Sequence, residues 1–318
     1  MATRVMLADN TPITDEQIQR LLDEAGFLWG QPKIDGMRMH INDDCHPASR
    51  SGKIFKHQYL KAFCRDHPSM RGLDGEVVPG HEYHPAAFRE AMSSIRAEDG
   101  TPDFTYYLFD HIPLGNEEYS HRMAYLESAV QSKGEYIQNP TGGYYVRLIV
   151  TPSEILNTLE EVHAFEQKVL TDGWEGAMLR HPFKPYKFGR STNRGGELVK
   201  LKRFEDAEAI VTGFDPWERN DNDPTTDVRG YTVRTSHQDG KVPLEMLGAL
   251  HVELATDRSV KFKIGVMRGV THEERCRLWV NRAALIGRIC KFKHQGYGGG
   301  YDVPRCPVFL NWRTPSEF

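Results

Sequence analysis

The chain has 318 residues, with 40 Lys plus Arg against 44 Asp plus Glu and a formal net charge of −4. Hydrophobic residues make up 39% of it and charged residues 26%, a balance that is typical of globular proteins and excludes a mostly disordered chain. It contains no apolar run near the ~18 residues that a membrane-spanning helix needs, and its first residues lack the apolar core of a secretory signal. The sequence therefore predicts a cytoplasmic protein of two modest domains. The mildly acidic net charge does not by itself indicate nucleic-acid binding.

The five cysteines, at positions 45, 64, 276, 290 and 306, form no CxxC pair. Their odd number and their spacing argue against a disulfide framework and against a four-thiolate zinc site. The 14 histidines show no HExxH or similar ligand spacing. We therefore expect buried or incidental thiols in a reducing compartment.

The first part of the chain alternates between helical and strand-like patterns. Thr14 and Gln17 form a capping-box pattern ahead of an apolar face, and Gly26 suits the end of the helix that they predict. Further helices are expected near 57–67, near 84–97 and at 153–170, where Ile155 belongs to the expected inward face. Strands are expected at 37–41, 73–78, 104–109, 176–179 and 198–202.

The character of the sequence changes near residue 204. Several short strands with one helix suggest a small β-barrel beyond that point. The strands are expected at 209–214, 231–234, 247–254, 259–264 and 289–294, and the helix at about 271–285. We therefore place one domain at 1–204 and a second at 205–318, with a polar loop at about 216–243 that leaves the barrel.

Charge is distributed unevenly in the second domain. Residues 258–293 contain ten Lys or Arg and only two acids, Glu273 and Glu274. A solvated surface is the ordinary explanation of such a stretch. Because these residues fall on the expected strands and helix of a small barrel, we favour an electrostatic footprint for a polyanion.

Four groups of residues carry the chemistry. The first, Lys33-Ile34-Asp35-Gly36-Met37-Arg38, would by itself be an ordinary Asp-Gly turn that leads into a strand. The others follow in order: Asp74-Gly75-Glu76, Glu175-Gly176 and Lys200-Leu201-Lys202. Strand alternation puts Lys200 and Lys202 on one face, where two ammonium groups repel unless an anion such as a phosphate lies between them. An exposed strand face with two solvated lysines is common, but it does not account for the other groups.

With their neighbours, these groups resemble the ordered motifs of the covalent nucleotidyltransferases: ATP-dependent DNA ligases, RNA ligases and mRNA capping enzymes. The matching segments are KIDGMR, LDGEVV, YLFDHIP, WEGAMLR and LVKLKRF. Four further segments are similar to ATP-dependent DNA ligases, above all to the short two-domain ligases of bacteriophages and other viruses: YKFGRST at 186–192, LGALHVEL at 247–254, VKFKIG at 260–265 and PRCPVFLNWR at 304–313. The resemblance implies an α+β fold, in which an ATP-grasp-like nucleotidyltransferase domain precedes an OB-fold barrel.

The resemblance implies an enzyme that uses ATP to seal 3′-hydroxyl/5′-phosphate nicks in duplex DNA. A lysine attacks the α-phosphate of ATP, AMP passes from the lysine to the 5′-phosphate at the nick, and the 3′-hydroxyl then displaces AMP. It also implies magnesium or another hard divalent cation and a monomer with no membrane and no obligate protein partner, in the host cytoplasm if the protein is viral. Because Lys33 lies close to the first residue and no cysteine zinc motif is present, we expect ATP rather than NAD as the donor.

The resemblance assigns the lysine–AMP bond to Lys33. A free lysine has a pKa of about 10.4, so a neighbouring cation, either a bound metal or Lys200 and Lys202, is expected to favour its neutral amine. Asp35 shares the face of Lys33 if the segment is extended, and it is expected to contact the ribose or to position the lysine. Gly36 would let the backbone approach the nucleotide closely.

Further residues are expected around the nucleotide on the same resemblance. Glu76 resembles the glutamate that binds the ribose hydroxyl, and it is a candidate metal ligand together with Glu175, which resembles the carboxylate that engages the divalent cation. Phe109 resembles the aromatic residue that stacks on adenine, and Met178 the apolar contact on the opposite face. Four cationic side chains are expected near the phosphates: Arg38, Arg50, Lys200 and Lys202.

The DNA contacts also come from the resemblance. Arg38 resembles the arginine that holds the 5′-phosphate of the nick, and Lys187, Arg190 and Ser191 resemble residues that contact the DNA backbone around it. The loop at 216–243 is expected to form part of a DNA clamp, as a loop of the barrel does in some short viral ligases.

Two arginines of the barrel, Arg305 and Arg313, lie in the segment that matches the last motif of the family. That segment helps to orient pyrophosphate in the family, and we also expect both arginines to contact DNA. The segment departs from the family pattern, because Cys306 stands in place of an aromatic residue, Asn311 stands in place of a glycine, and no RxDK follows.

Two alternatives remain open at this point. An RNA ligase or a capping guanylyltransferase of the same superfamily differs in donor and acceptor, which the residue chemistry does not decide. A non-catalytic nucleic-acid-binding protein of the same fold is disfavoured because Lys33, Glu175, Lys200 and Lys202 are all present.

Overall fold

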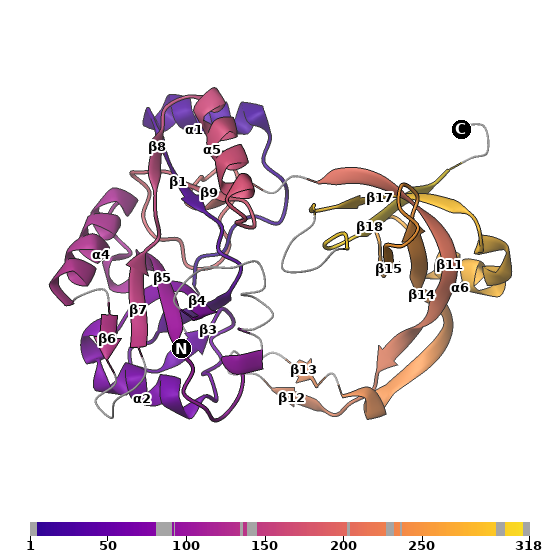
Figure 1. Cartoon of the computed structure of the whole chain (residues 1–318), viewed down its shortest axis with the longest axis horizontal. Coiled ribbons are helices and arrows are strands. Elements are labelled where there is room, and N and C mark those ends of the chain that lie inside the picture. The colour runs from indigo at the N-terminus through magenta and orange to yellow at the C-terminus, as the bar shows by residue number, and fades with distance from the viewer. Residues whose placement is uncertain are drawn as a thin grey trace. The chain divides into compact units, whose positions relative to one another are not determined.

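The computed structural model describes residues 5–80, 91, 93–133, 136–138, 145–201, 204–226, 232–235, 237–296 and 303–313. The chain divides into two compact units, residues 1–202 and 203–318 (Figure 1). This boundary lies within two residues of the one expected near 204. Each unit has its own sheets and its own hydrophobic core. None of the helices in the described parts of the chain is long and apolar enough to span a membrane.

The smaller sheet of the first unit has the strand order β10-β9-β1-β8, and helices α1 and α5 share its hydrophobic core. Strand β1 pairs antiparallel with both β8 and β9, so the chain that leads to Lys33 lies inside the sheet. The elements are α1 (Asp15–Ala25), β1 (Leu28–Pro32), β8 (Glu154–Leu156), α5 (Leu159–Thr171), β9 (Ala177–Arg180) and β10 (Val199–Leu201).

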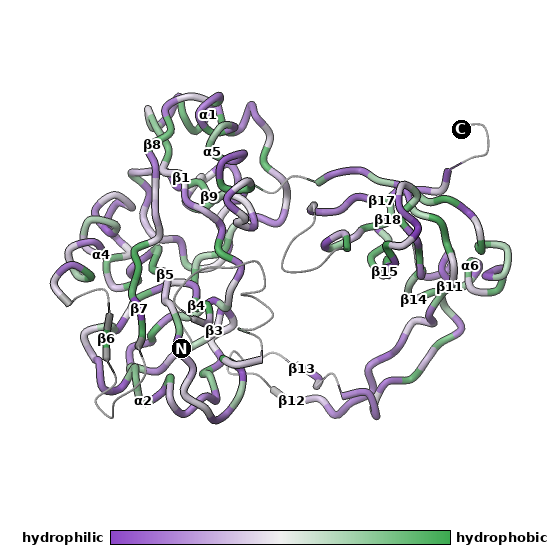
Figure 2. Tube along the Cα trace, viewed as in Figure 1, coloured by the Kyte–Doolittle hydropathy of each residue, from purple (hydrophilic) through white to green (hydrophobic). Residues whose placement is uncertain are grey.

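The larger sheet of this unit has the strand order β3-β2-β4-β5-β7-β6. Alternation along β5 sends Phe104, Tyr106 and Leu108 into the main core, and Figure 2 shows hydrophobic stretches along the central strands. The strands are β2 (Met37–Ile41), β3 (Pro47–Ser49), β4 (Leu73–Pro79), β5 (Phe104–His111), β6 (Tyr136–Gln138) and β7 (Tyr145–Val150). The helices are α2 (Gln58–Asp66), η1 (Pro68–Met70), η2 (Ile112–Leu114) and α4 (Tyr119–Lys133).

Helix α1 forms as its sequence predicts. The Thr14 side chain accepts a hydrogen bond from the backbone of Gln17, and the Gln17 side chain accepts one from Thr14 N, which confirms the capping box. Gly26 ends the helix in the left-handed conformation, with φ of 81°. The second expected helix is α2, whereas the third, near 84–97, falls largely outside the described residues.

The helix expected at 153–170 is wrong in its first turns. Residues 154–156 form strand β8, and α5 begins only after Thr158, whose side chain accepts a hydrogen bond from Glu161 N. Ile155 is 51% exposed instead of facing the core, because the period of a strand turns Leu156 inward. Pairing with β1 decides this outcome, and that partner lies far away in the sequence.

The second unit is a six-stranded barrel with the strand order β15-β14-β11-β17-β18-β16. The outermost strands of that order, β15 and β16, are joined through Gly265 alone, so the sheet closes on itself. This arrangement confirms the small barrel. Among the described residues of this unit the expected helix at about 271–285 is the α-helix α6 (His272–Val280), which is followed by the short 3-10 helix η4 (Arg282–Leu285). The barrel strands of this unit are β11 (Glu205–Asn220), β14 (Lys241–Leu254), β15 (Lys261–Ile264), β16 (Val266–Met267), β17 (Ile289–His294) and β18 (Val308–Trp312), and a separate pair is formed by β12 (Pro224–Thr226) and β13 (Thr232–Arg234). Its helices are η3 (Gln238–Gly240), α6 (His272–Val280) and η4 (Arg282–Leu285).

The segment expected as a polar loop at 216–243 contains paired strands, of which the sequence predicts only the one at 231–234, and it is found as β13. Strands β11 and β14 continue beyond the barrel as a two-stranded ribbon whose pairing reaches Asn220 and Lys241 (Figure 1). The short strands β12 and β13 pair with each other in the segment that joins the two long strands. The described ribbon residues are exposed or half-buried, so they show no alternating apolar pattern that would predict a strand.

Candidate active site

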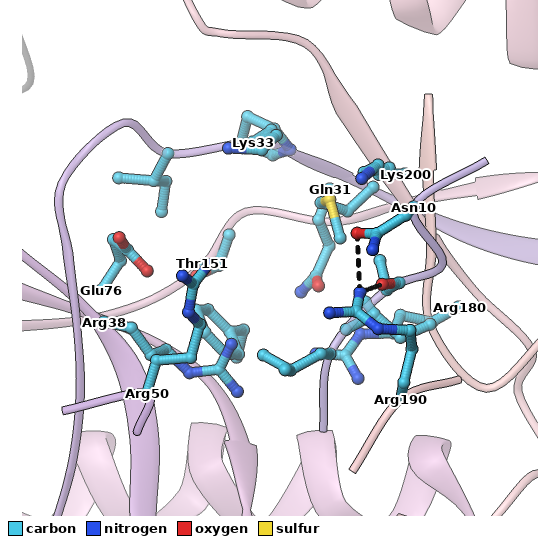
Figure 3. A pocket seen from close by; sticks show the side chains of 17 residues that line it. Asn10, Gln31, Lys33, Arg38, Arg50, Glu76, Thr151, Arg180, Arg190 and Lys200 are labelled. Atoms are coloured by element: carbon cyan, nitrogen blue, oxygen red, sulfur yellow. Dashed lines mark hydrogen bonds between the residues drawn. The ribbon is translucent and has the colours of Figure 1, made fainter. Parts of the chain in front are cut away.

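A cavity of about 270 Å³ is lined by residues from both sheets of the first unit (Figure 3). The smaller sheet contributes Gln31, Met178, Arg180 and Lys200, and the larger sheet contributes Arg38, Glu76 and Phe109. Residues of the first two sequence groups and Lys200 of the KxK strand therefore meet in one place. Figure 3 shows Arg38, Arg50 and Glu76 on one side, with Asn10 and Arg190 on the other.

One wall of the cavity comes from a segment that the sequence analysis did not assign. Leu7, Ala8 and Asn10 line the cavity, and this segment runs beside the YKFGRST motif. Leu7 N donates to Gly189 O at 2.8 Å, and Ser191 N donates to Leu7 O at 2.7 Å. The segment has no charged or catalytic pattern, so only its pairing with a distant motif reveals its place.

Lys33 directly follows β1 and lines the cavity. Its Nζ donates a hydrogen bond to Glu175 Oε2, and the two side chains form an ion pair. The backbones are paired as well, since Glu175 N donates to Lys33 O at 3.2 Å and Lys33 N donates to Gly176 O at 2.7 Å. The Lys33 side chain is 26% exposed and the Glu175 side chain only 8%. The amine therefore reaches the cavity while its partner carboxylate is held in the protein.

Glu76 lies opposite Arg38 in the pairing of β2 with β4. Burial raises the pKa of Glu76 to about 7, and the charges of Arg38 and Lys33 oppose this rise. The charges of Glu175 and Asp35 add to it. Glu175 and Asp35 thus act electrostatically on Glu76 near Lys33, and Glu76 is about half protonated at neutral pH.

Glu76 and Glu175 offer carboxylate oxygens, the donor type that magnesium prefers. Among the described residues, no group of three or more His, Cys, Asp or Glu side chains could hold a metal by itself. Magnesium is commonly held by one or two carboxylates and completes its shell with phosphate oxygens and water. The residues at this site therefore fit a cation that arrives with a nucleotide.

Three side chains form a row across the smaller sheet. Met178 in β9 lies opposite Gln31 in β1 and opposite Lys200 in β10. Residues paired across strands point to the same face of a sheet, and all three line the cavity. Met178 and Lys200 thus both line the cavity, whereas Lys202 lies outside the described residues.

A β-bulge sets the position of Phe109. The pairing of β4 with β5 shifts between Asp74 and Gly75, which face Asp110 and Leu108, so Phe109 is the extra residue. A bulge re-aims a side chain and is frequent beside active sites. Phe109 lines the cavity, and the Arg38 guanidinium carbon lies 4.5 Å from the centre of its ring.

Arg38 is tightly held. Its Nε donates to Asp74 Oδ1 at 2.6 Å and its Nη2 donates to Asp74 Oδ2 at 2.7 Å, which is a bidentate pair. Burial is the largest single influence on the pKa of Arg38 and lowers it, but the charge and the hydrogen bonds of Asp74, together with the charges of Tyr186 and Glu76, raise the pKa above its usual value. The guanidinium therefore enters the cavity as a fixed, permanent cation.

Two cavity residues that the sequence analysis did not single out carry buried polar atoms without a hydrogen-bond partner among the described residues, Gln31 at Nε2 and Thr151 at Oγ1. Arg180 Nε is a third such atom, although Arg180 Nη1 donates to Asp110 Oδ2 at 3.1 Å. Unsatisfied buried groups that face a cavity are expected where a ligand supplies the partner. Gln31 precedes Lys33 by two residues, which was the available sequence signal.

The YKFGRST motif turns its side chains in different directions. Lys187 is 38% exposed and forms an ion pair with Glu197, so it is available at the surface. Arg190 lines the cavity, where its Nη1 donates to Asn10 Oδ1 at 2.9 Å. Ser191 is fully buried, and its hydroxyl donates to Glu197 Oε2 at 2.7 Å. The expected DNA contact of the Ser191 side chain is therefore corrected to an internal hydrogen bond.

Arg305 and Arg313 belong to the second unit. The Arg305 backbone pairs with Gln295 and Gly296, which fixes the start of the last segment. Arg313 follows β18, and its Nε donates to Glu208 Oε1 at 2.7 Å.

The basic stretch 258–293 is less free than its composition suggests. Lys263 pairs with Asp215, Lys291 pairs with Asp206, and Arg258 and Lys261 both pair with Glu253. Arg275 is buried, and its Nη1 donates to Leu247 O at 2.9 Å. Much of the local excess of positive charge is therefore neutralised by strands β11 and β14, which reduces the footprint expected from the sequence.

Comparison with protein families then decides the class. The model of the ATP dependent DNA ligase domain matches residues 5–202, which is more than half of the chain and includes every residue of the cavity. The chain belongs to the ATP-dependent DNA ligase family. The DNA ligase OB-like domain matches residues 240–313. The protein is thus an enzyme that uses ATP to form phosphodiester bonds in DNA, and the sequence-based assignment is confirmed over an RNA ligase or a capping enzyme.

Solved structures agree with this assignment. A Chlorella virus DNA ligase-adenylate is 26% identical with a TM-score of 0.52, and the match covers 98% of this chain and 100% of that one. A structure of the Lig E DNA ligases is 21% identical with a TM-score of 0.61, at 98% and 100% coverage, and supports the fold. A comparison with curated protein sequences finds no match.

Proposed function

We propose that Lys33 is the nucleophile of this ligase and that the cavity of the first unit holds the nucleotide. In the first step, Lys33 Nζ forms a bond to the α-phosphorus of ATP, the bond to the bridging oxygen breaks, and pyrophosphate leaves. The amine must be neutral to attack, and the proton that its nitrogen loses on bonding to phosphorus passes to the Glu175 carboxylate, which accepts its hydrogen bond. The Lys33–Glu175 contact at the cavity is the observation that carries the proposal.

Glu175 and Glu76 are proposed to hold a hard divalent cation. Bound there, the cation would neutralise charge on the phosphates of ATP. The electrostatic contact between the two carboxyl groups supports this role, because their mutual repulsion is relieved by a cation.

The remaining cavity residues are proposed to position the nucleotide. Phe109 offers an aromatic face to adenine and Met178 an apolar contact from the other sheet, while Gln31 Nε2 is a buried donor without a protein partner in the described chain. Glu76 and Asp35 are assigned to the ribose side. Lys200 and Arg50 face the phosphates, with Lys202 joining them on the motif alone. Phosphoryl transfer depends mainly on such positioning and charge neutralisation.

For the later steps, we propose nicked duplex DNA as the acceptor. Arg38 would hold the 5′-phosphate, and Lys187 and Arg190 the backbone around the nick. In the second unit, Arg305 and Arg313 are assigned to pyrophosphate orientation or DNA contact on the motif. The ribbon of β11 and β14 is proposed as a clamp element, since it extends beyond the barrel and is hydrophilic over much of its length (Figure 2). The protein is proposed to act as a monomer.

The proposal is tested with a labelled nicked duplex, ATP and magnesium. Lys33→Ala is expected to abolish sealing from ATP and to retain sealing of a nick that already carries AMP on its 5′-phosphate, because the last step does not use the lysine bond. Lys168→Ala is the matched control, since Lys168 is an exposed lysine paired with Glu154, away from the cavity. Sealing from ATP by the Lys33 variant at the control rate would overturn the proposal.

A further inference from the structure

Tyr186 lies behind the cavity wall and does not line it. The residue is only 4% exposed. Its hydroxyl donates to Asp74 Oδ2 at 2.7 Å and accepts a hydrogen bond from Met6 N at 2.8 Å. The phenol therefore both donates and accepts a hydrogen bond inside the protein. Its partners are distant in the sequence, since Asp74 is 112 positions from Tyr186 and Met6 is 180 positions from it.

These contacts close into a ring of hydrogen bonds. Asp74 accepts hydrogen bonds from Nε and Nη2 of Arg38, and Arg38 Nη2 also donates to Met6 O at 3.3 Å. The ring thus runs from Arg38 to Asp74, Tyr186 and the backbone of Met6, and back to Arg38. Met6 and Asp74 are fully buried, so water does not replace a lost member.

The ring fixes the orientation of Arg38, which is its one member that lines the cavity. Asp74 Oδ2 accepts from Tyr186 and from Arg38 at once, so the phenol fixes the plane of the carboxylate that grips the guanidinium. Burial, and then the charge of Asp74, raise the pKa of Tyr186, which keeps the phenol protonated as a donor. A long arginine side chain gains a single orientation only from such fixed partners.

We infer that Tyr186 is a positioning residue that orients Arg38, through Asp74, for recognition of the 5′-phosphate at a nick. The inference rests on the proposed function of Arg38. It predicts that the Tyr186 hydroxyl matters for the phosphate of the nick and not for the rest of the DNA. It also predicts that the first step, in which ATP reacts with Lys33, is affected little.

The test is equilibrium binding of the full-length protein to two nicked duplexes that differ only in a 5′-phosphate or a 5′-hydroxyl, without divalent cation so that no reaction occurs. Tyr186→Phe is expected to lower the preference for the 5′-phosphate nick about tenfold, the size of one hydrogen bond to a charged group. Affinity for the 5′-hydroxyl nick is expected to stay within about twofold. A phosphate-specific loss is not what general destabilisation produces.

Tyr106→Phe is the matched control. The Tyr106 hydroxyl is equally buried and donates to Met39 O and Leu73 O at 3.0 and 3.1 Å, so its loss removes two hydrogen bonds in the same sheet without touching Asp74. Its preference for the 5′-phosphate nick is expected to equal that of the unaltered protein. Asp74→Asn is a second variant of the ring, and it is expected to lose the preference as Tyr186→Phe does, because a neutral amide grips a guanidinium less well.

Arg38→Ala distinguishes the phosphate-binding role of Arg38 from the positioning role of Tyr186. It is expected to remove the preference for the 5′-phosphate, and adding Tyr186→Phe is expected to change nothing further, because the phenol acts through Arg38. If Arg38→Ala keeps the preference, the role proposed for Arg38 is overturned and this inference falls with it. If Arg38→Ala loses the preference while Tyr186→Phe retains it, or if their effects add, only the positioning role is overturned.

Discussion

Lys33 and Glu175 are paired through both their backbones and their side chains. Glu175 N donates to Lys33 O at 3.2 Å, and Lys33 Nζ returns a hydrogen bond to the Glu175 carboxylate. The two residues are 142 positions apart, yet the pairing of β1 with β9 brings the loops beside these strands together. The amine that is proposed to attack ATP therefore has its carboxylate partner held in place at the edge of the paired strands β1 and β9.

The first prediction concerns that carboxylate. Glu175→Gln keeps the shape of the side chain and removes its charge, so the variant loses the anionic partner of Lys33 and the carboxylate that we propose as a metal ligand. Lysine adenylation is expected to slow about 100-fold, the usual size of one electrostatic contribution at such a site. Glu160→Gln is the control, because Glu160 is exposed in the first turn of α5. Rapid-quench measurement of labelled AMP on the protein checks this, and equal rates in the two variants would contradict it.

The second prediction concerns pH and Glu76. Its pKa is raised to about 7, so between about pH 5 and 7 the folded protein holds a proton that the unfolded chain has released. The cost of ionising Glu76 is absent below the unfolded pKa of about 4.5, grows as the pH rises from there to about 7, and is constant above that. In Glu76→Gln this contribution disappears. The variant is expected to gain about 1–3 kcal/mol in free energy of unfolding relative to the unaltered protein from pH 5 to pH 8.

Urea unfolding of the nucleotide-free protein at several pH values measures this difference. A difference between the two proteins that does not change with pH would mean that Glu76 titrates in its ordinary range.

The third prediction separates structural from DNA-contacting residues in the YKFGRST motif. The Ser191 hydroxyl donates to Glu197 and accepts a hydrogen bond from Leu198 N at 3.2 Å. Ser191→Ala is expected to lower the free energy of unfolding by about 1–2 kcal/mol and to leave nick affinity unchanged. Lys187→Ala is expected to leave the free energy of unfolding unchanged and to weaken nick binding. It is also expected to reduce the slope of log affinity against log salt by about 1. Weaker nick binding by a fully folded Ser191 variant would restore its role as a DNA contact.

The fourth prediction concerns the ribbon. Residues 221–240 are replaced by an Asn-Gly turn, which closes β11 and β14 at the last pair, Asn220 and Lys241. The barrel core lies in residues that the deletion leaves untouched, so the protein is expected to fold. Nick affinity is expected to fall at least tenfold, whereas formation of the lysine–AMP adduct continues at the original rate. Loss of the adduct would show that the ribbon is not a separate clamp element.

Local features of the sequence predict the fold well where a structural element depends on its own residues. The Thr14 and Gln17 capping box and Gly26 define α1 without help from the rest of the chain. Ile155 shows the opposite case, because an apolar residue in a helical pattern became part of a strand once β1 was available to pair. The pattern within the segment contains no information about that partner.

The candidate site likewise combines features that local motifs predict with features that depend on long-range packing. The motifs point to many of the residues that line the cavity, but they do not show which contacts hold those residues in place. A Cβ at Gly36 would lie 2.6 Å from Val77 O, so this glycine is required by β4, whatever its approach to a nucleotide. The bulge that places Phe109 and the hydrogen bonds of Tyr186 to Asp74 and Met6 arise from long-range packing that no motif spacing encodes.

The assignment of Lys33 as the nucleophile is tested most directly by one measurement. The protein is incubated with ATP and magnesium without DNA, and its intact mass is recorded before the modified residue is mapped by peptide fragmentation under conditions that preserve P–N bonds. The account predicts addition of a single AMP, located on Lys33. An adduct on another residue, or no adduct in a protein that still seals nicks from ATP, would contradict it.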